Sequence, residues 1–208
     1  ARLNYLLNPG HESETYGGSL YWNRKSGKCY YDSSNSTTSC NFMSTGLTGE
    51  AKAMIGDAKW YLGGTSDYAS SLASFYKNER GTAIYNSSRS TNWTGKVGLM
   101  YPSDYGYATS GGSSTNRASC MAKELYNWKD NSYSDCKNND WLYNSSLYQW
   151  TMSPGADNSS GVFYVYNTGF VRNESAYVIP AVRPVVHLKS TIKITGGTGS
   201  STDPFILG

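Results

Sequence analysis

Side chains suited to ligand recognition gather late in the chain, in residues 153–177, where Tyr, Asn and Ser are interspersed with small and apolar residues. Tyr offers a large contact area at low entropic cost, and Ser and Asn offer adaptable hydrogen bonds. If Val165 and Val171 face the core, strand alternation turns the neighbouring aromatic residues and one arginine outward. We therefore predict a binding face of Tyr164, Tyr166, Phe170, Arg172 and Asn173, bordered by Asp157, Asn158, Ser160, Asn167, Glu174 and Tyr177.

The alternative interpretation of this segment is an ordinary solvent-exposed sheet face, on which aromatic residues only pair across strands. The combination of Tyr, Ser, Gly and Asn with one Arg is typical of antibody-combining sites, and it favours binding.

Signals for catalysis are weak. The chain has two histidines, His11 in a polar segment and His187 in a strand, and we interpret His187 as a packed or strand-face residue. The carboxylates are scattered, and Asp130, Asp135 and Asp140 come closest to a cluster. Oxygen-rich loops can hold calcium, but a solvated polar loop is the simpler interpretation. We therefore expect no enzymatic activity and no cofactor, with calcium as the one candidate ion.

Four cysteines form two close pairs, Cys29 with Cys40 and Cys120 with Cys136. Neither pair has the two-residue gap of zinc or redox sites. We predict two local disulfides with this pairing, although the other two pairings stay open. Disulfides form in oxidising compartments, which indicates a secreted or surface protein.

The composition excludes several classes of protein. Ser, Thr, Asn, Tyr and Gly fill just over half of the 208 residues, and only 16% are charged. A net charge of +3 without a basic stripe argues against nucleic-acid binding. No apolar run is long enough for a membrane span, and 14% aromatic residues argue against disorder.

The segments that must position these residues are predicted to be helices in the earlier part of the chain and strands mainly in the later part. We predict helices over residues 48–62, 66–81 and 115–128, and strands that include residues 96–101, 148–152, 162–167, 169–172, 182–189, 191–195 and 205–207. A hairpin is expected to turn at residues 167–169. The order indicates an α+β fold with a mainly antiparallel sheet and long, disulfide-stapled loops.

Four segments in fixed order carry a family resemblance: KVGLMYPSDY at residues 96–105, WTMSP at 150–154, the turn at 167–169, and AVRPVVHL at 181–188. This set resembles the C-type-lectin-like fold, in the branch shared with formylglycine-generating-enzyme-like domains. The resemblance covers about residues 95–190. It implies one domain over residues 1–190, with residues 1–45 packed on it and residues 191–208 as a C-terminal hairpin tail.

The branch includes the variable proteins of diversity-generating retroelements, which display a C-terminal patch for ligand binding. That patch corresponds by order to residues 157–177 here. The copper-dependent cysteine chemistry of the branch is not carried over, because all four Cys precede Trp150. Calcium-dependent sugar binding by the motifs of C-type lectins is not implied either. The chain has Asn139-Asp140-Trp141 in the wrong order and no EPN-like motif.

The N-terminal half and the tail resemble exported, pilin-like surface proteins of Gram-positive bacteria. We therefore expect an adhesin-like domain, associated with a type IV pilus or the cell surface, that binds a protein or glycan on a cell surface. One alternative is a structural pilin subunit, a partner of other pilus subunits, in which residues 205–207 pair with a neighbour. A second alternative is a glycan-active enzyme, which would need paired carboxylates in a cleft.

Overall fold

The computed structural model describes residues 47–67, 69–85, 89–176, 180–200 and 202–208. The chain divides into two compact units, and the described residues of the first are 47–58, 94–97, 186–200 and 202–208. The second unit comprises residues 59–93 and 98–185. Cys29, Cys40, Tyr177 and the expected packing of residues 1–45 lie outside the described residues.

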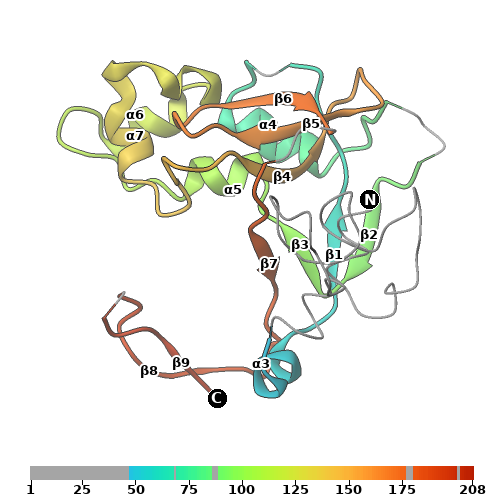
Figure 1. The fold of residues 1–208 in the computed structure, drawn as a ribbon, viewed down its shortest axis with the longest axis vertical. Coiled ribbons are helices and arrows are strands. Elements are labelled where there is room, and N and C mark those ends of the chain that lie inside the picture. Colours follow the sequence, from blue (N-terminus) through green and yellow to red (C-terminus); the bar gives the residue numbers. More distant parts are fainter. Residues whose placement is uncertain (1–46, 68, 86–88, 177–179, 201) are drawn as a thin grey trace, which may run out of the picture. The chain divides into compact units, whose positions relative to one another are not determined.

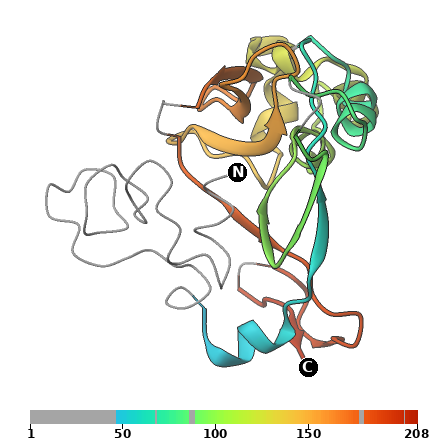
Figure 2. The same cartoon turned by 90° about the vertical axis from the view of Figure 1, so that its right-hand side faces the viewer.

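The predicted α+β class is confirmed, because helices occur together with antiparallel strands (Figures 1 and 2). The larger unit is built on a three-stranded sheet of β4 (Gln149–Pro154), β5 (Gly161–Val165) and β6 (Val171–Ser175), in the order β4-β5-β6. β1 (Ala58–Tyr61) pairs with β2 (Asn92–Gly95), and β3 (Val97–Leu99) pairs with β7 (Pro184–Val186).

Short helices surround the three-stranded sheet. α4 (Leu72–Glu79) packs on α5 (Pro102–Tyr107), and α5 contacts β4 and β5. α6 (Arg117–Ala122), the 3-10 helices η1 (Leu125–Lys129) and η2 (Asn131–Tyr133), and α7 (Ser134–Asn138) follow one another in the chain. The core that these elements share consists of Leu72, Phe75, Met100, Tyr105, Cys120, Leu125, Trp128, Cys136, Leu142, Phe163, Val165 and Val171.

The first unit holds α3 (Gly49–Met54) and a ribbon of β8 (Ile194–Gly196) with β9 (Ile206–Leu207). The predicted helix over residues 48–62 is therefore too long. The Thr48 side chain caps its start as expected, but Ile55 is extended and bridges to Leu188. Its side chain is buried, so pairing and burial override the helical periodicity after Met54.

The other two predicted helices are also shorter than the sequence pattern indicates. α4 begins after Ser71, whose side chain caps Ser74, and it buries Leu72, Phe75 and Glu79. The apolar periodicity of residues 69–76 places Ala73 and Tyr76 on the same face as Leu72, but both lie on the exposed side. The third helix breaks where Glu124 forms a bridge to Ser71. Its last turn continues as the 3-10 helix η1.

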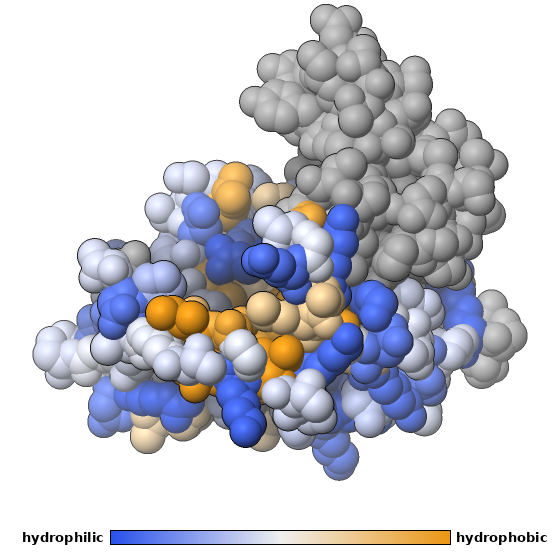
Figure 3. All heavy atoms as spheres, turned by 90° about the horizontal axis from the view of Figure 1, so that it is seen from below, coloured by the Kyte–Doolittle hydropathy of each residue, from blue (hydrophilic) through white to orange (hydrophobic). Residues whose placement is uncertain are grey.

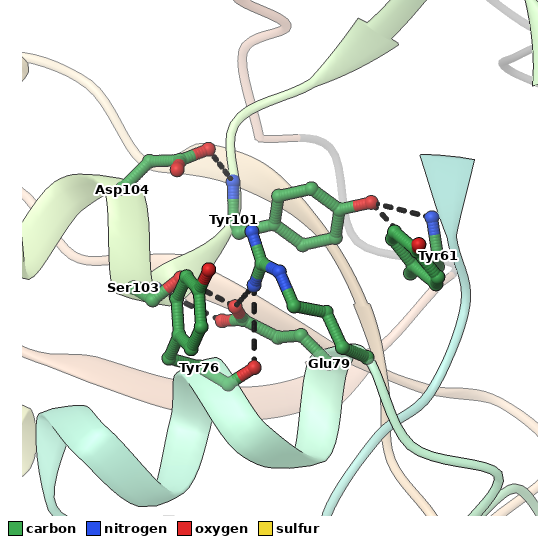
Figure 4. A network of polar contacts seen from close by, with 7 residues as sticks. Tyr61, Tyr76, Glu79, Tyr101, Ser103 and Asp104 are labelled. Atoms are coloured by element: carbon green, nitrogen blue, oxygen red, sulfur yellow. Dashed lines mark hydrogen bonds and ion pairs between the residues drawn. The ribbon is translucent and has the colours of Figure 1, made fainter. Parts of the chain in front are cut away.

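A buried carboxylate joins α4 to α5 (Figure 4). Glu79 accepts a hydrogen bond of 2.9 Å from the backbone N–H of Ser103 and a short one from the Ser103 hydroxyl. Because Ser103 lies in the first turn of α5, Glu79 satisfies a helix N–H that has no partner within its own helix. Arg80 donates to Glu79 over 3.2 Å, and its guanidinium lies 3.6 Å from the ring centre of Tyr76.

The same region ties α5 to β1. The Tyr101 hydroxyl donates to the Tyr61 carbonyl over 2.9 Å and accepts from the Tyr61 N–H over 2.7 Å. Asp104 accepts from the Tyr101 N–H over 2.9 Å, which closes the start of the helix. These contacts fix the segment between β3 and α5 against the end of β1.

One predicted disulfide is confirmed. Cys120 in α6 and Cys136 in α7 are bonded, with their Cα atoms 5.4 Å apart, and both side chains are fully buried. The bridge holds the helical segment that follows α5 against the rest of the core.

We expect alkylation of the denatured, unreduced chain to leave Cys120 and Cys136 unlabelled. The double variant C120A/C136A should lose about 3 kcal/mol of unfolding free energy in urea, the chain-entropy value for a loop of this size. Labelling of both thiols, or an unchanged unfolding midpoint in the double variant, would contradict this account of the bridge.

A second prediction concerns pH. Burial raises the pKa of Glu79 to about 7 from an ordinary value of 4.5, despite its hydrogen bonds from Ser103. A carboxyl with a raised folded pKa stabilises the fold fully below its unfolded pKa, and that contribution is lost as pH rises through the folded pKa. The titration of Glu79 should therefore lower the free energy of unfolding by about 3 kcal/mol as pH rises from below 4.5 to above 7.

Urea denaturation across this range measures the effect in wild type, in E79Q and in a control, E50Q, which changes an exposed residue of α3. E79Q should lose this part of the pH dependence, whereas E50Q should keep it. The slope that remains in E79Q belongs in part to Asp140, whose pKa burial also raises to about 7. A full slope in E79Q would show that Glu79 does not titrate in this way.

Candidate ligand-binding face

The hairpin of β5 and β6 has the predicted turn. The Tyr166 N–H donates to the Phe170 carbonyl over 2.8 Å, and the Gly169 N–H donates to the Tyr166 carbonyl over 2.9 Å. Gly169 has a φ of +90°, which an L residue rarely adopts. Its carbonyl accepts from the buried Tyr105 hydroxyl over 2.7 Å, so the turn is anchored to the core.

The pairing register sends alternate side chains to opposite faces of the sheet. Val165 and Val171 are fully buried on the core face, as predicted, and Phe163 is fully buried beside them. On the other face Tyr164 lies between Trp150 of β4 and Arg172 of β6. Tyr166 and Phe170 extend the same face beyond the last strand pair.

Six rings form one continuous cluster on this side, which we call the aromatic face: Tyr126, Tyr148, Trp150, Tyr164, Tyr166 and Phe170. Tyr166 and Phe170 stack with ring centres 4.1 Å apart, and Tyr166 lies 4.6 Å from Tyr164. Tyr148 meets Tyr166 edge-on at 5.1 Å, and Tyr126 meets Phe170 edge-on at 5.6 Å. Such contacts hold each ring in a fixed orientation.

The rings differ in exposure. Tyr148 is 44% exposed, Tyr126, Tyr166 and Phe170 are half-buried, and Tyr164 is only 4% exposed. Burial raises the pKa of the Tyr164 hydroxyl, and the neighbouring Tyr166 raises it further. Tyr164 thus lies beneath the surface, and it supports the exposed rings rather than offering itself to a ligand. This corrects the expectation that Tyr164 is turned outward to solvent.

Cations border the aromatic face. The Lys129 ammonium lies 3.6 Å from the ring centre of Tyr126 and 5.7 Å from that of Phe170. A hydrogen bond from Lys129, and then its charge, lower the pKa of the Tyr126 hydroxyl. Arg172, with 44% of its side chain exposed, lies 3.9 Å from Glu174.

The predicted polar residues gather at the opposite end of the hairpin. Asn158 accepts from the Ser160 N–H over 2.8 Å and from its hydroxyl over 2.9 Å, which shapes the loop between β4 and β5. Asp157 is exposed in the same loop. The five residue pairs of β5 and β6 separate this loop from the turn, a span of about 16 Å. Asn173 pairs with the core-facing Phe163 in the middle of the hairpin, so it lies on the core side of the sheet and not on the predicted binding face. The predicted set therefore divides into an aromatic part and a polar part.

Asn167 belongs to the turn end, where its carbonyl accepts from the Tyr143 hydroxyl over 2.6 Å. Lys137 reaches the same turn and donates to the Thr168 carbonyl over 2.9 Å. Glu174, besides facing Arg172, accepts from the Ser175 N–H over 3.1 Å. Of the predicted binding residues, Tyr166, Phe170, Arg172 and Asn167 share the aromatic end.

Four residues of the site were not predicted: Tyr126, Lys129, Tyr148 and Trp150. Tyr148 has a signal in the sequence, because it stands two residues before Trp150 and alternation places both on one side of a strand. Tyr126 and Lys129 stand three residues apart on the 3-10 helix η1, where residues i and i+3 eclipse. The predicted helix over residues 115–128 includes Tyr126 and ends before Lys129, and it gives neither residue a partner.

The acidic candidates for a calcium site serve structural roles. Asp135 accepts from the Ser114 and Thr115 N–H groups over 2.7 and 2.9 Å, and Asp140 is buried and accepts from the Leu142 N–H over 2.8 Å. In the described part of the chain, no group of three or more His, Cys, Asp or Glu is arranged to hold a metal ion.

Comparisons of the chain with protein-family models, curated protein sequences and solved structures find no match. Among the described residues, no helix combines the length and the apolar character needed to cross a membrane.

The difference in burial within the aromatic face is testable by thermal and urea unfolding. Y164A removes a ring packed against three others and should cost about 3 kcal/mol of unfolding free energy. Y148A removes a ring that is 44% exposed and should cost less than about 1 kcal/mol. Equal losses in the two variants would contradict the description of Tyr164 as support and Tyr148 as surface.

Proposed function

We propose that this chain is an adhesin-like, ligand-binding domain of a secreted or bacterial cell-surface protein, with a C-type-lectin-like architecture. The observation that carries the proposal is the aromatic face. Its exposed rings are held in place by a sheet whose other side is the core, so they are rigid before any ligand arrives. Rigid Tyr side chains beside an Arg are typical of the residues that dominate binding energies at interfaces.

The fold gives further support. The segments that carry the family resemblance fall on β3 and α5, on β4 and on β7, and β3 pairs with β7. The late β5–β6 hairpin displays the rings in the region where that branch displays its variable patch. The buried Cys120–Cys136 bridge is consistent with an oxidising compartment.

One observation favours the second candidate, a structural subunit that assembles through its tail. The β8–β9 ribbon exposes Ile194 and Ile206 by about 60%, and Phe205 is also exposed. Figure 3 shows that hydrophobic residues gather on the face of the molecule that it displays. Isolated two-stranded ribbons are marginally stable, so these apolar residues are suited to pairing with a second copy.

Sedimentation at several protein concentrations distinguishes the two functions. A subunit should associate with rising concentration and lose association in I194T/I206T, whereas an adhesin should stay monomeric.

The proposed binding function is tested with fluorescently labelled domain on bacterial and host cells. Y148A should weaken cell binding at least tenfold, because loss of a central aromatic contact costs about 2 kcal/mol or more. Y85A is the matched control, since Tyr85 is similarly exposed but lies outside the aromatic face. Equal binding by wild type and Y148A, with both folded, would overturn the proposal.

A further inference from the structure

Three cations surround the turn end of the β5–β6 hairpin. Lys129 of η1 lies 5.7 Å from the ring centre of Phe170, and Lys137 of α7 donates to the Thr168 carbonyl. Arg172 of β6 follows Phe170 by two residues, and the exposed Asp130 follows Lys129 in the chain. Within the described residues, Lys129 and Lys137 form no ion pair, and Arg172 has only its 3.9 Å approach to Glu174. The other predicted carboxylate of the site, Asp157, lies at the open end of the hairpin.

The positions of two of these cations are fixed by contacts that leave their charge in place. Lys129 is held over the Tyr126 ring, and Lys137 is held by the Thr168 carbonyl. Neither contact neutralises the ammonium group, since a ring face and a carbonyl carry no net charge. The aromatic face therefore has a fixed positive border at one end, next to the stacked pair of Tyr166 and Phe170.

We propose that the aromatic face recognises an acidic glycan, in which a sugar ring lies on the exposed rings and its carboxylate meets Lys129 and Arg172. This inference rests on the proposed binding function and specifies its ligand class. The C–H groups on one side of a sugar ring carry partial positive charge and suit the negative faces of aromatic rings. A carboxylate beside them would gain a charge-assisted hydrogen bond, bidentate if it meets Arg172.

The rings favour a glycan over an extended peptide. Peptides that bind sheets usually add a strand at an edge, and β5, which carries the central ring Tyr164, is paired on both sides. The outer edge of β4 is also occupied, because Trp150 donates to Ala181 and Met152 donates to Met100. In the described residues the outer edge of β6 has no strand partner, and a peptide added there would lie beside the rings rather than on them. A cation and aromatic rings could also receive a nucleotide base and phosphate, but the small net charge of +3 argues against a nucleic-acid track.

The test uses an oligogalacturonate and its methyl ester, which have the same ring geometry but differ in charge. Calorimetric titration should show binding of the acid and at least tenfold weaker binding of the ester. The double variant K129Q/R172Q should lose at least tenfold for the acid, whereas K77Q, which changes an exposed lysine of α4, should not. Y148A should weaken binding of the acid as well.

Two further probes, a glutamate-rich peptide and single-stranded oligothymidylate, complete the test. Tighter binding of either one, or equal binding of the acid and its ester, would overturn the acidic-glycan proposal. If no probe binds but Y148A still abolishes cell binding, the glycan class is wrong and the binding function stands. If Y148A leaves cell binding unchanged, both proposals fall.

Discussion

The pleat of strand β5 is the constraint on which the rest of the larger unit depends. Phe163 and Val165 point into the core, where Phe163 meets Phe75 edge-on at 5.2 Å. Tyr164, between them, points the other way and underlies the exposed rings. A shift of β5 by one residue would exchange the two faces. The core therefore fixes the orientation of the surface that we assign to binding, and the Tyr105–Gly169 hydrogen bond fixes the turn at its end.

Much of this arrangement follows from the sequence. Alternation around Val165 and Val171, and a turn ending in Gly169, are sufficient to predict the hairpin and to place Tyr166, Phe170 and Arg172 on one side. Alternation alone does not predict how deep a residue lies. Tyr164 alternates in the same way as Tyr166, but it is flanked by strands on both sides and covered by Tyr148 and Trp150. Its burial depends on neighbours far away in the sequence.

The helices were predicted less well, because tertiary contacts override their periodicity. Ile55 and Glu124 leave their predicted helices to form bridges with Leu188 and Ser71. Glu79 is buried on α4 because it caps α5, a role that apolar periodicity does not indicate. The break at Glu124 also creates η1, and with it the contact between Lys129 and the aromatic face. The part of the site that the sequence does not predict thus arises where the helix is interrupted.

The central claim is that the exposed rings of the aromatic face are covered when the domain binds its target. Tyrosine nitration of the free and the cell-bound domain, quantified by mass spectrometry, measures for each tyrosine whether binding shields its ring from the reagent. Tyr148 should become protected on binding, while Tyr85, which is similarly exposed, should react equally in both states. Protection of Tyr85 with unchanged reaction of Tyr148 would contradict the assignment of the aromatic face as the binding surface.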